Sequence, residues 1–344
     1  MLRPLPLLTA LVLAGPVLFG LIGTILPAFG YLVPGADRPM TMALTWPGLP
    51  RALTVSVTSG ILSTLGALSV AALITAGWHG TRVFVWLERM LSPLLAVPHA
   101  AAALGLAFLV SPSGWILRIP ANVMGWEAAP DLLILNDPWG LSLTAGLIAK
   151  EMPFLLLMML AALTQVSAGP RLAVARSLGQ GRVSAWMKAV FPDVYAQMRL
   201  PVLVVLVFGM TNVDVAVILG PTTPTTLSVQ VTRWMMDPDL SARAVAAAGG
   251  LILFAATLVV LAVWLVAERL MAQIGRAWVW SGRGAPERLA RGCGLTLATG
   301  SAAMVLAGLA ALAMWSVAAR WAYPDLLPEA LTLRSWSRFG PDMA

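Results

Sequence analysis

Uncharged stretches long enough to cross a lipid bilayer recur along the chain. Six of them contain no charged residue, namely 4–36, 52–81, 90–117, 152–170, 244–267 and 292–319. A seventh stretch, 200–219, is interrupted only by Asp214. A helix crosses the hydrocarbon core with about 20 apolar residues. The pattern therefore predicts seven spans, at 7–29, 52–76, 85–110, 140–164, 200–219, 244–267 and 294–318.

The composition supports a membrane environment. Hydrophobic residues make up 59% of the chain and charged residues 11%, whereas a soluble domain carries about 25% charged residues. We therefore expect an all-α polytopic membrane protein. The uncharged stretch that follows Arg3 continues to Asp37, which is too long for a cleavable signal peptide and favours a retained first helix.

The distribution of basic residues predicts the topology. With a cytoplasmic N-terminus, the inside segments hold 13 Lys and Arg residues against 8 in the outside segments. This asymmetry fits the positive-inside rule. Because the basic residues lie between apolar runs, they are interpreted as orienting the chain in a membrane, and no nucleic-acid partner is expected.

The spans divide the chain into three parts. Residues 1–275 are predicted to form a six-span module with a cytoplasmic loop at 167–192. Residues 276–293 are polar, basic and rich in glycine, which is typical of a linker. Residues 294–344 contain the seventh span and a further outer segment.

Charged residues inside the predicted spans need partners, because each costs about 2.5–3.5 kcal/mol at membrane depth. Lys150 and Glu151 are adjacent in the fourth span and point about 100° apart, so a mutual ion pair is not expected. One hypothesis pairs Lys150 with Asp214 in the fifth span, beside Asn212. Such groups either hold helices together or line a translocation path or gate.

Sequence signatures of enzyme chemistry are missing. The chain contains no H-E-x-x-H, no G-x-S-x-G and no G-x-x-x-x-G-K-[ST] motif, so we do not expect this chain to hydrolyse ATP. A single cysteine and two histidines offer no metal-ligand set. His99 is expected to be a helix-packing group, and no cofactor is predicted.

The loop between the fourth and fifth spans predicts two short helices joined by a glycine. Gly169-Pro170 fits a helix start, and Gly179 supplies a left-handed stop. A second helix is predicted from about 182 to 191, ending at Pro192. Apolar side chains lie among basic ones in this loop, at Leu172, Leu178, Val183 and Trp186. A bent segment of this kind is suited to docking in a groove of another protein.

This loop resembles the cytoplasmic loop of bacterial binding-protein-dependent ABC importer permeases. The pattern of that family is Glu-Ala-Ala, three residues, Gly, nine residues and Ile-x-Leu-Pro. Here Ala173-Val174-Ala175 takes the first place, Gly179 matches the glycine, and 189–192 matches the end with an identical Pro192. Ala173 replaces the acidic residue, which puts in doubt any ion pair it would make with the ATPase.

The resemblance covers about residues 5–275 and implies a six-span bundle of the type I importer fold with one additional helix. Lys150-Glu151-x-Pro153 and the segment 214–224 resemble permeases of the iron(III), thiamine and polyamine type. The implied partners are a dimer of ABC ATPase subunits, a periplasmic solute-binding protein, a second permease half or subunit, and the lipid bilayer. The implied location is the bacterial inner membrane. The implied ATPase-coupling residues are Ala173, Ala175, Arg176, Leu178, Gly179, Arg182, Trp186 and Pro192.

Permeases of the iron and thiamine type are often two fused six-span halves, so the seventh span resembles the start of a second half. We expect the remainder to be absent by truncation or supplied by a separate polypeptide. By resemblance, the solute is thiamine or a related small cation; iron(III), polyamines and sulfate-like anions stay open. The alternatives are an ion-coupled secondary transporter, which would show inverted repeats and midplane carboxylates, and a membrane scaffold or nonfunctional fragment.

Overall fold

The computed structural model describes residues 4–35, 37–284 and 286–337, and it is almost entirely helical. The first part runs through α1 (Pro4–Ala28), α2 (Pro39–Thr45), α3 (Leu49–Trp78), α4 (Arg82–Leu91), the 3₁₀ turn η1 (Ser92–Leu95), α5 (His99–Val110), α6 (Trp115–Met124) and α7 (Leu141–Leu163). The second part comprises α8 (Ala168–Ser177), α9 (Arg182–Ala189), α10 (Phe191–Thr211), α11 (Asp214–Leu219), α12 (Leu227–Met235), α13 (Ala242–Trp280), α14 (Glu287–Val317), β1 (Ala318–Arg320), β2 (Ala330–Leu331) and α15 (Arg334–Ser337). The strands pair antiparallel. Within the described residues, seven helical stretches are long and apolar enough to cross a membrane, which confirms the all-α polytopic fold.

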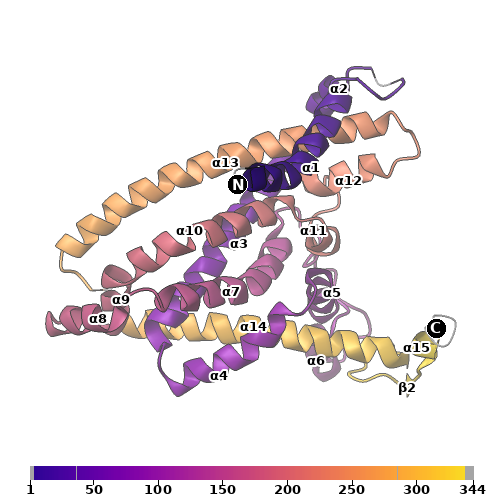
Figure 1. The fold of residues 1–344 in the computed structure, drawn as a ribbon. Coiled ribbons are helices and arrows are strands. Elements are labelled where there is room, and N and C mark those ends of the chain that lie inside the picture. Colours follow the sequence, from indigo (N-terminus) through magenta and orange to yellow (C-terminus); the bar gives the residue numbers. More distant parts are fainter. Residues whose placement is uncertain (1–3, 36, 285, 338–344) are drawn as a thin grey trace.

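Helix α3 lies at the centre of the bundle, against α7, α10 and α14 (Figure 1). Its buried face is built from small residues, among them Ser56, Gly60, Ser63 and Ala67. Small residues let helix backbones approach closely in a membrane protein. A Cβ added at Gly60 would lie 2.4 Å from the Cγ of Met210 on α10, so the glycine is what permits this contact.

The third predicted span is not one helix. Residues 85–110 are divided into α4, η1 and α5, and the apolar stretch long enough to cross a membrane runs over α5 and α6, from His99 to Met124. Pro93 and Pro98 lie at the interruptions. Proline removes a backbone donor and disfavours helix in the residue before it, and this effect outweighed the apolar run used for the prediction.

The fifth predicted span also differs from expectation. Helix α10 begins at Phe191, nine residues before the predicted start, and ends at Thr211. A separate helix, α11, follows from Asp214. Pro192 therefore lies in the first turn of α10, where proline is tolerated, and does not simply end the preceding helix as predicted.

The seventh span packs against the six-span module. Helix α14 lies along α3 and α5, and it crosses α5 where Gly105 faces Gly308. A Cβ on Gly308 would be 2.7 Å from the carbonyl carbon of Gly105, so the two backbones touch. Helices α13 and α14 extend into the predicted linker, which leaves 281–286 between them in place of 276–293.

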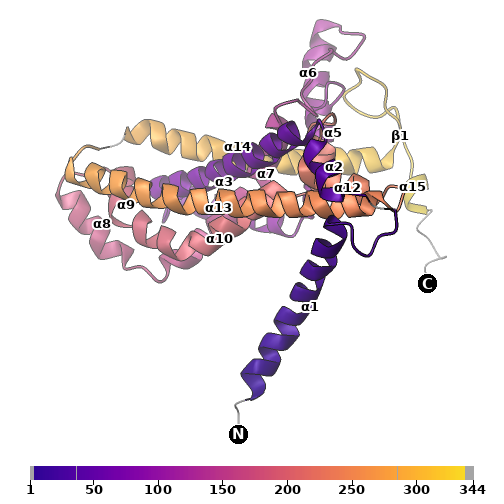
Figure 2. The ribbon, with the colours of Figure 1, turned by 90° about the horizontal axis from the view of Figure 1, so that it is seen from above.

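Helix α1 projects from the rest of the bundle (Figure 2). None of the residues in its apolar window is buried within the chain. Its contacts are with α13 and α2, and Ala28 at its end is fully buried. The apolar surface of α1 is therefore presented to the surroundings of this chain.

Candidate functional site

The loop singled out by sequence folds as two helices with a left-handed glycine between them. Gly179 has φ of 78°, as predicted. The N–H of Gly179 donates to Arg176 O at 2.9 Å, and the N–H of Gln180 donates to Ala175 O at 3.2 Å. These two bonds form the Schellman motif that closes a helix C-terminus. The glycine sets the angle between α8 and α9.

The two helices of this loop differ in burial. Helix α9 is held in the molecule by Val183, Ala185 and Trp186, each 3% exposed or less. Helix α8 has no buried residue and lies at the edge of the molecule (Figure 1). Val174 is 62% exposed, and Leu178 at the end of α8 is 75% exposed. The loop thus consists of an anchored helix and an uncovered one.

Three other segments hold α9 in place. Arg182 donates to the carbonyl of His79, just after α3. Lys188 Nζ donates to Arg283 O at 2.7 Å and lies 4.8 Å from the ring centre of Trp278. Because these bonds join 79, 182–188 and 283, the three connections predicted to be cytoplasmic lie at the same end of the bundle.

The most extensive of these anchors comes from the seventh helix. Glu287 at the start of α14 accepts from Val183 N at 2.9 Å, from Ser184 N at 3.0 Å and from the Ser184 hydroxyl at 3.1 Å. A carboxylate at a helix N-terminus satisfies free N–H groups and complements the helix dipole. A Cβ on Gly181 would lie 2.3 Å from Glu287 Oε1, so glycine at this position admits the carboxylate.

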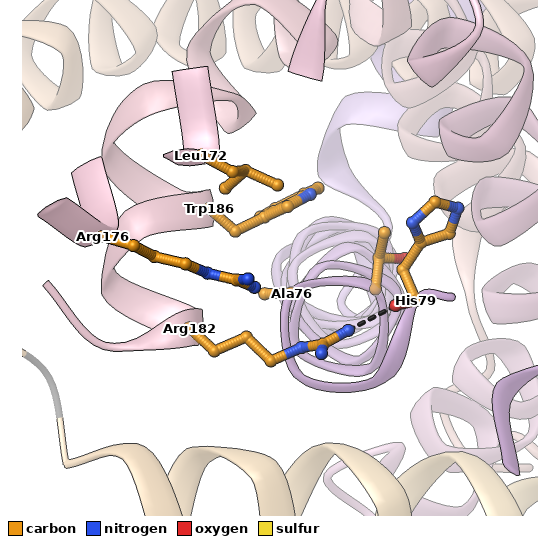
Figure 3. A pocket seen from close by; sticks show the side chains of 7 residues that line it. Ala76, His79, Leu172, Arg176, Arg182 and Trp186 are labelled. Carbon is orange, nitrogen blue, oxygen red and sulfur yellow. Dashed lines mark hydrogen bonds between the residues drawn. The ribbon is translucent and has the colours of Figure 1, made fainter. Parts of the chain in front are cut away.

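The remaining predicted coupling residues lie on α8 and at the start of α10. Ala173 is exposed and Ala175 is half-buried on α8, while Arg176 is exposed and points toward the end of α3 (Figure 3). Pro192 is exposed in the first turn of α10. The loop residues therefore form one continuous segment around Gly179, although they do not all face the same way.

A second polar cluster lies within the bundle. Lys150 is 5% exposed on α7, and its Nζ donates to the carbonyl oxygens of Leu94 and Val97. The Leu94 carbonyl belongs to η1, and the Val97 carbonyl to the segment between η1 and α5. The lysine thus satisfies backbone acceptors that the broken helix leaves free, and the hypothesis of a Lys150–Asp214 pair is wrong.

Glu151 joins α7 to the same interruption. Its Oε1 lies 3.1 Å from His99 Nε2 at the start of α5, and the His99 ring is 4.8 Å from the ring of Phe208 on α10. Glu151 is 6% exposed, whereas the His99 side chain is 36% exposed. As expected, Lys150 and Glu151 face different partners, and His99 packs between helices.

The two candidate residues of the fifth span serve the second interruption. Asn212 is buried, and its Oδ1 accepts from Val215 N at 2.8 Å, which caps α11. The Ser228 hydroxyl donates to Asn212 O at 2.9 Å. Asp214 is exposed in the first turn of α11. Asn212 is therefore structural in this fold, and Asp214 lies apart from Lys150 and Glu151.

Two contacts of the site were not predicted from the sequence. Glu287 fell in the predicted linker, and nothing local indicates that it reaches α9. His99 was predicted to pack between helices, and its contact with Glu151 was not predicted. Within the described residues, no group of three or more His, Cys, Asp or Glu side chains could hold a metal ion.

The chain is similar to the inner membrane ABC transporter permease protein YnjC of Escherichia coli (strain K12), with 31% identity over 211 residues. The match covers 60% of this chain and 39% of the relative, so the chain spans well under half the length of the protein it matches. No family model matches the chain.

Proposed function

We propose that this chain is a transmembrane permease subunit of an ATP-driven importer in the bacterial inner membrane, with its N-terminus in the cytoplasm. The observation that carries the proposal is the uncovered helix α8, closed by Gly179 and joined to an anchored α9. The similarity to a curated ABC transporter permease supports it. ATP hydrolysis is assigned to a separate ATPase subunit.

The coupling mechanism follows from this arrangement. The exposed Val174 and Leu178 provide an apolar contact for the ATPase, and burial of such side chains favours association. Movement of α8 reaches α9 through the rigid Schellman turn. From α9 the movement reaches the end of α3 through Arg182. It reaches α13 through the contact of Lys188 with Trp278, and α14 through the bond of Ser184 to Glu287. A force applied at the loop is thereby distributed to three membrane helices.

The domain organisation is part of the proposal. Residues 1–275 form the first permease module, and 294–344 begin a second one whose first helix, α14, packs on α3 and α5. Two ATPase subunits need two docking loops, and the described residues contain one such loop. A second permease half or subunit would supply the other and would cover apolar surface such as that of α1.

The solute and its path complete the proposal. A periplasmic binding protein delivers a small solute, for which we propose thiamine or a related cation. Lys150, Glu151, Asn212 and Asp214 are the candidate path or gate residues, and the partly exposed His99 joins them through Glu151. The interruptions of the third and fifth spans lie beside these groups, and backbone that is not helical within a membrane lines cavities or protein interfaces.

The test is co-purification with the cognate ATPase after substitution of Gly179. Gly179→Leu places a branched side chain at φ of 78°, where a residue with a Cβ costs about 1–2 kcal/mol, and changes the angle of α8. We expect loss of ATPase co-purification and of ATP-dependent solute uptake, with the protein still inserted in the membrane. Gly169→Leu is the matched control, because Gly169 lies in the same loop with open space around it and no positive φ.

An ion-coupled secondary transporter is the second candidate, favoured by the interrupted third span beside the buried Lys150 and Glu151. It predicts uptake that a protonophore abolishes in vesicles without ATP and that Gly179→Leu leaves intact. Uptake with those properties would overturn the ATP-driven proposal.

A further inference from the structure

A cavity of about 190 Å³ lies between the loop helices and the end of α3. It is lined by Thr75, Ala76, His79, Leu172, Arg176, Arg182 and Trp186. Figure 3 shows Arg176 and Arg182 extending from α8 and α9 toward the end of α3. The Trp186 ring lies above the two arginines in this view, beside Leu172. Arg176 is exposed and Trp186 is buried, so the cavity extends from the surface to the indole.

Positive charge around this cavity exceeds the negative charge available to balance it. The pKa of Arg182 is lowered by desolvation first and then by the charges of Arg176 and Arg291, with Glu287 opposing. The carboxylate of Glu287 is already bonded to the N-terminus of α9. Desolvation and Arg182 also lower the pKa of His79, and Glu88 opposes them. Three guanidinium groups, those of Arg176, Arg182 and Arg291, thus lie near one another, while the opposing carboxylates are Glu287 at Arg182 and Glu88 at His79.

Buried donors in the cavity wall have no partner in the structure. Trp186 is 3% exposed, and its indole Nε1 makes no hydrogen bond; the same is true of Arg182 Nε. Figure 3 shows the indole nitrogen at the end of the ring that points toward the end of α3. A buried donor left unpaired costs about 1–3 kcal/mol, so an acceptor that reaches these donors would stabilise the loop.

We propose that this cavity binds a phosphate-type oxyanion, held by the guanidinium groups of Arg176 and Arg182 and by the indole N–H of Trp186. Arginine presents several donors in a planar fork that matches such oxygens. The volume admits one tetrahedral group. The oxyanion belongs either to the headgroup of an anionic lipid of the adjacent leaflet or to free phosphate.

One contact within the chain accounts for part of the charge. Arg182 donates to His79 O and so complements the negative end of α3. That bond uses a terminal nitrogen of Arg182 and leaves Nε free, and it does nothing for Arg176 or for the indole. The end of α3 therefore provides an acceptor for one nitrogen of Arg182. The proposed oxyanion would provide acceptors for Arg176, for Arg182 Nε and for the indole N–H.

A bound oxyanion would link α8, α9 and the end of α3. Arg176 lies on the uncovered helix, while Arg182 and Trp186 lie on the anchored one, so one ligand would restrain the position of α8. The site requires only the folded chain and is independent of the proposed transport function. A bound oxyanion would hold α8 in the same position whichever partner protein contacts the loop.

The test measures binding to the purified full chain in detergent. Inorganic phosphate, with chloride at equal ionic strength as reference, is followed by its effect on Tm. Phosphatidylglycerol, with phosphatidylcholine as reference, is followed by native mass spectrometry. We expect at least one of the two probes to bind in preference to its reference. The preferred probe then shows whether the oxyanion is free phosphate or a lipid headgroup. Trp186→Phe, which keeps the ring and removes the donor, and Arg176→Gln should each weaken that binding about tenfold.

Arg288→Gln is the matched control, because Arg288 is exposed at the same end of the molecule and outside the cavity. Its binding should equal that of the unaltered chain. The proposal is overturned if neither probe is preferred over its reference, if Trp186→Phe and Arg176→Gln bind as tightly as the unaltered chain, or if Arg288→Gln loses as much affinity as they do. Because Arg176 is exposed, its variant stays informative even if Trp186→Phe fails to fold.

Discussion

Single side chains in this protein take the place of missing backbone partners. Lys150 donates to two carbonyls at the interruption before α5, and Asn212 caps α11 after the interruption in the fifth span. Asp137 plays the same role for α7, where it accepts from Leu141 N at 2.8 Å and Ser142 N at 2.9 Å. Inside a membrane no water replaces such partners, so Lys150 and Asn212 are needed at the helix interruptions. Asp137 closes the start of α7 just outside the predicted span.

Replacing Lys150 tests this role. Lys150→Met keeps the length of the side chain and leaves the carbonyls of Leu94 and Val97 without their donor. We expect a loss of about 1–3 kcal/mol in unfolding free energy, seen as a lower Tm in detergent. Asp214→Asn is the control and should leave Tm unchanged, because Asp214 is exposed. Equal losses for both variants would instead restore the Lys150–Asp214 pair.

At the scale of elements, the sequence predicts where helices lie better than where they break. The extent of α3 follows from an uncharged run, and that of α7 from an apolar run interrupted by Lys150 and Glu151, because lipid requires apolar residues over a fixed thickness. The breaks at Pro93, Pro98 and Asn212 did not follow, because their stability depends on Lys150 of α7 and Ser228 of α12, which are supplied by other helices. Likewise, the turn at Gly179 could be predicted locally, whereas the reach of Glu287 to α9 could not.

The crossing of α5 and α14 is the element contact most sensitive to side-chain size. Gly308→Leu would force the two backbones apart, because even a Cβ would lie 2.7 Å from the carbonyl carbon of Gly105. Overpacking of this kind costs about 1–3 kcal/mol. We expect a lower Tm and faster proteolysis within 281–286. Gly300→Leu, on the same helix with nothing within 4 Å, should behave like the unaltered chain, and a similar loss there would contradict the crossing.

For the whole molecule, the seventh helix connects the exposed loop with the membrane core. Helix α14 packs on α3 and α5 along its length and carries Glu287 to the start of α9. A linker between independent modules would not need such bonds. The first module and the seventh helix therefore behave as one mechanical unit.

Glu287→Gln tests this unit. The substitution removes the charge and one of the two acceptor oxygens at the N-terminus of α9, an interaction of about 1 kcal/mol. We expect faster amide hydrogen exchange in residues 183–186, with little change in α3. Glu329→Gln is the control, because Glu329 pairs with Arg320 at 3.5 Å in the segment that joins β1 and β2. Unchanged exchange in α9 after Glu287→Gln would show that the seventh helix does not hold it.

Helix α13 has 39 residues, which corresponds to a length of about 58 Å, whereas the hydrocarbon layer is about 30 Å thick. The last turns of α13 therefore extend beyond the hydrocarbon layer. They carry Trp278 and so set the height and rotation at which this ring meets Lys188 of α9. One inserted residue would raise that end by about 1.5 Å and turn it by about 100°. Inserting a whole turn would restore the rotation of that end but would still raise it by about 5.4 Å.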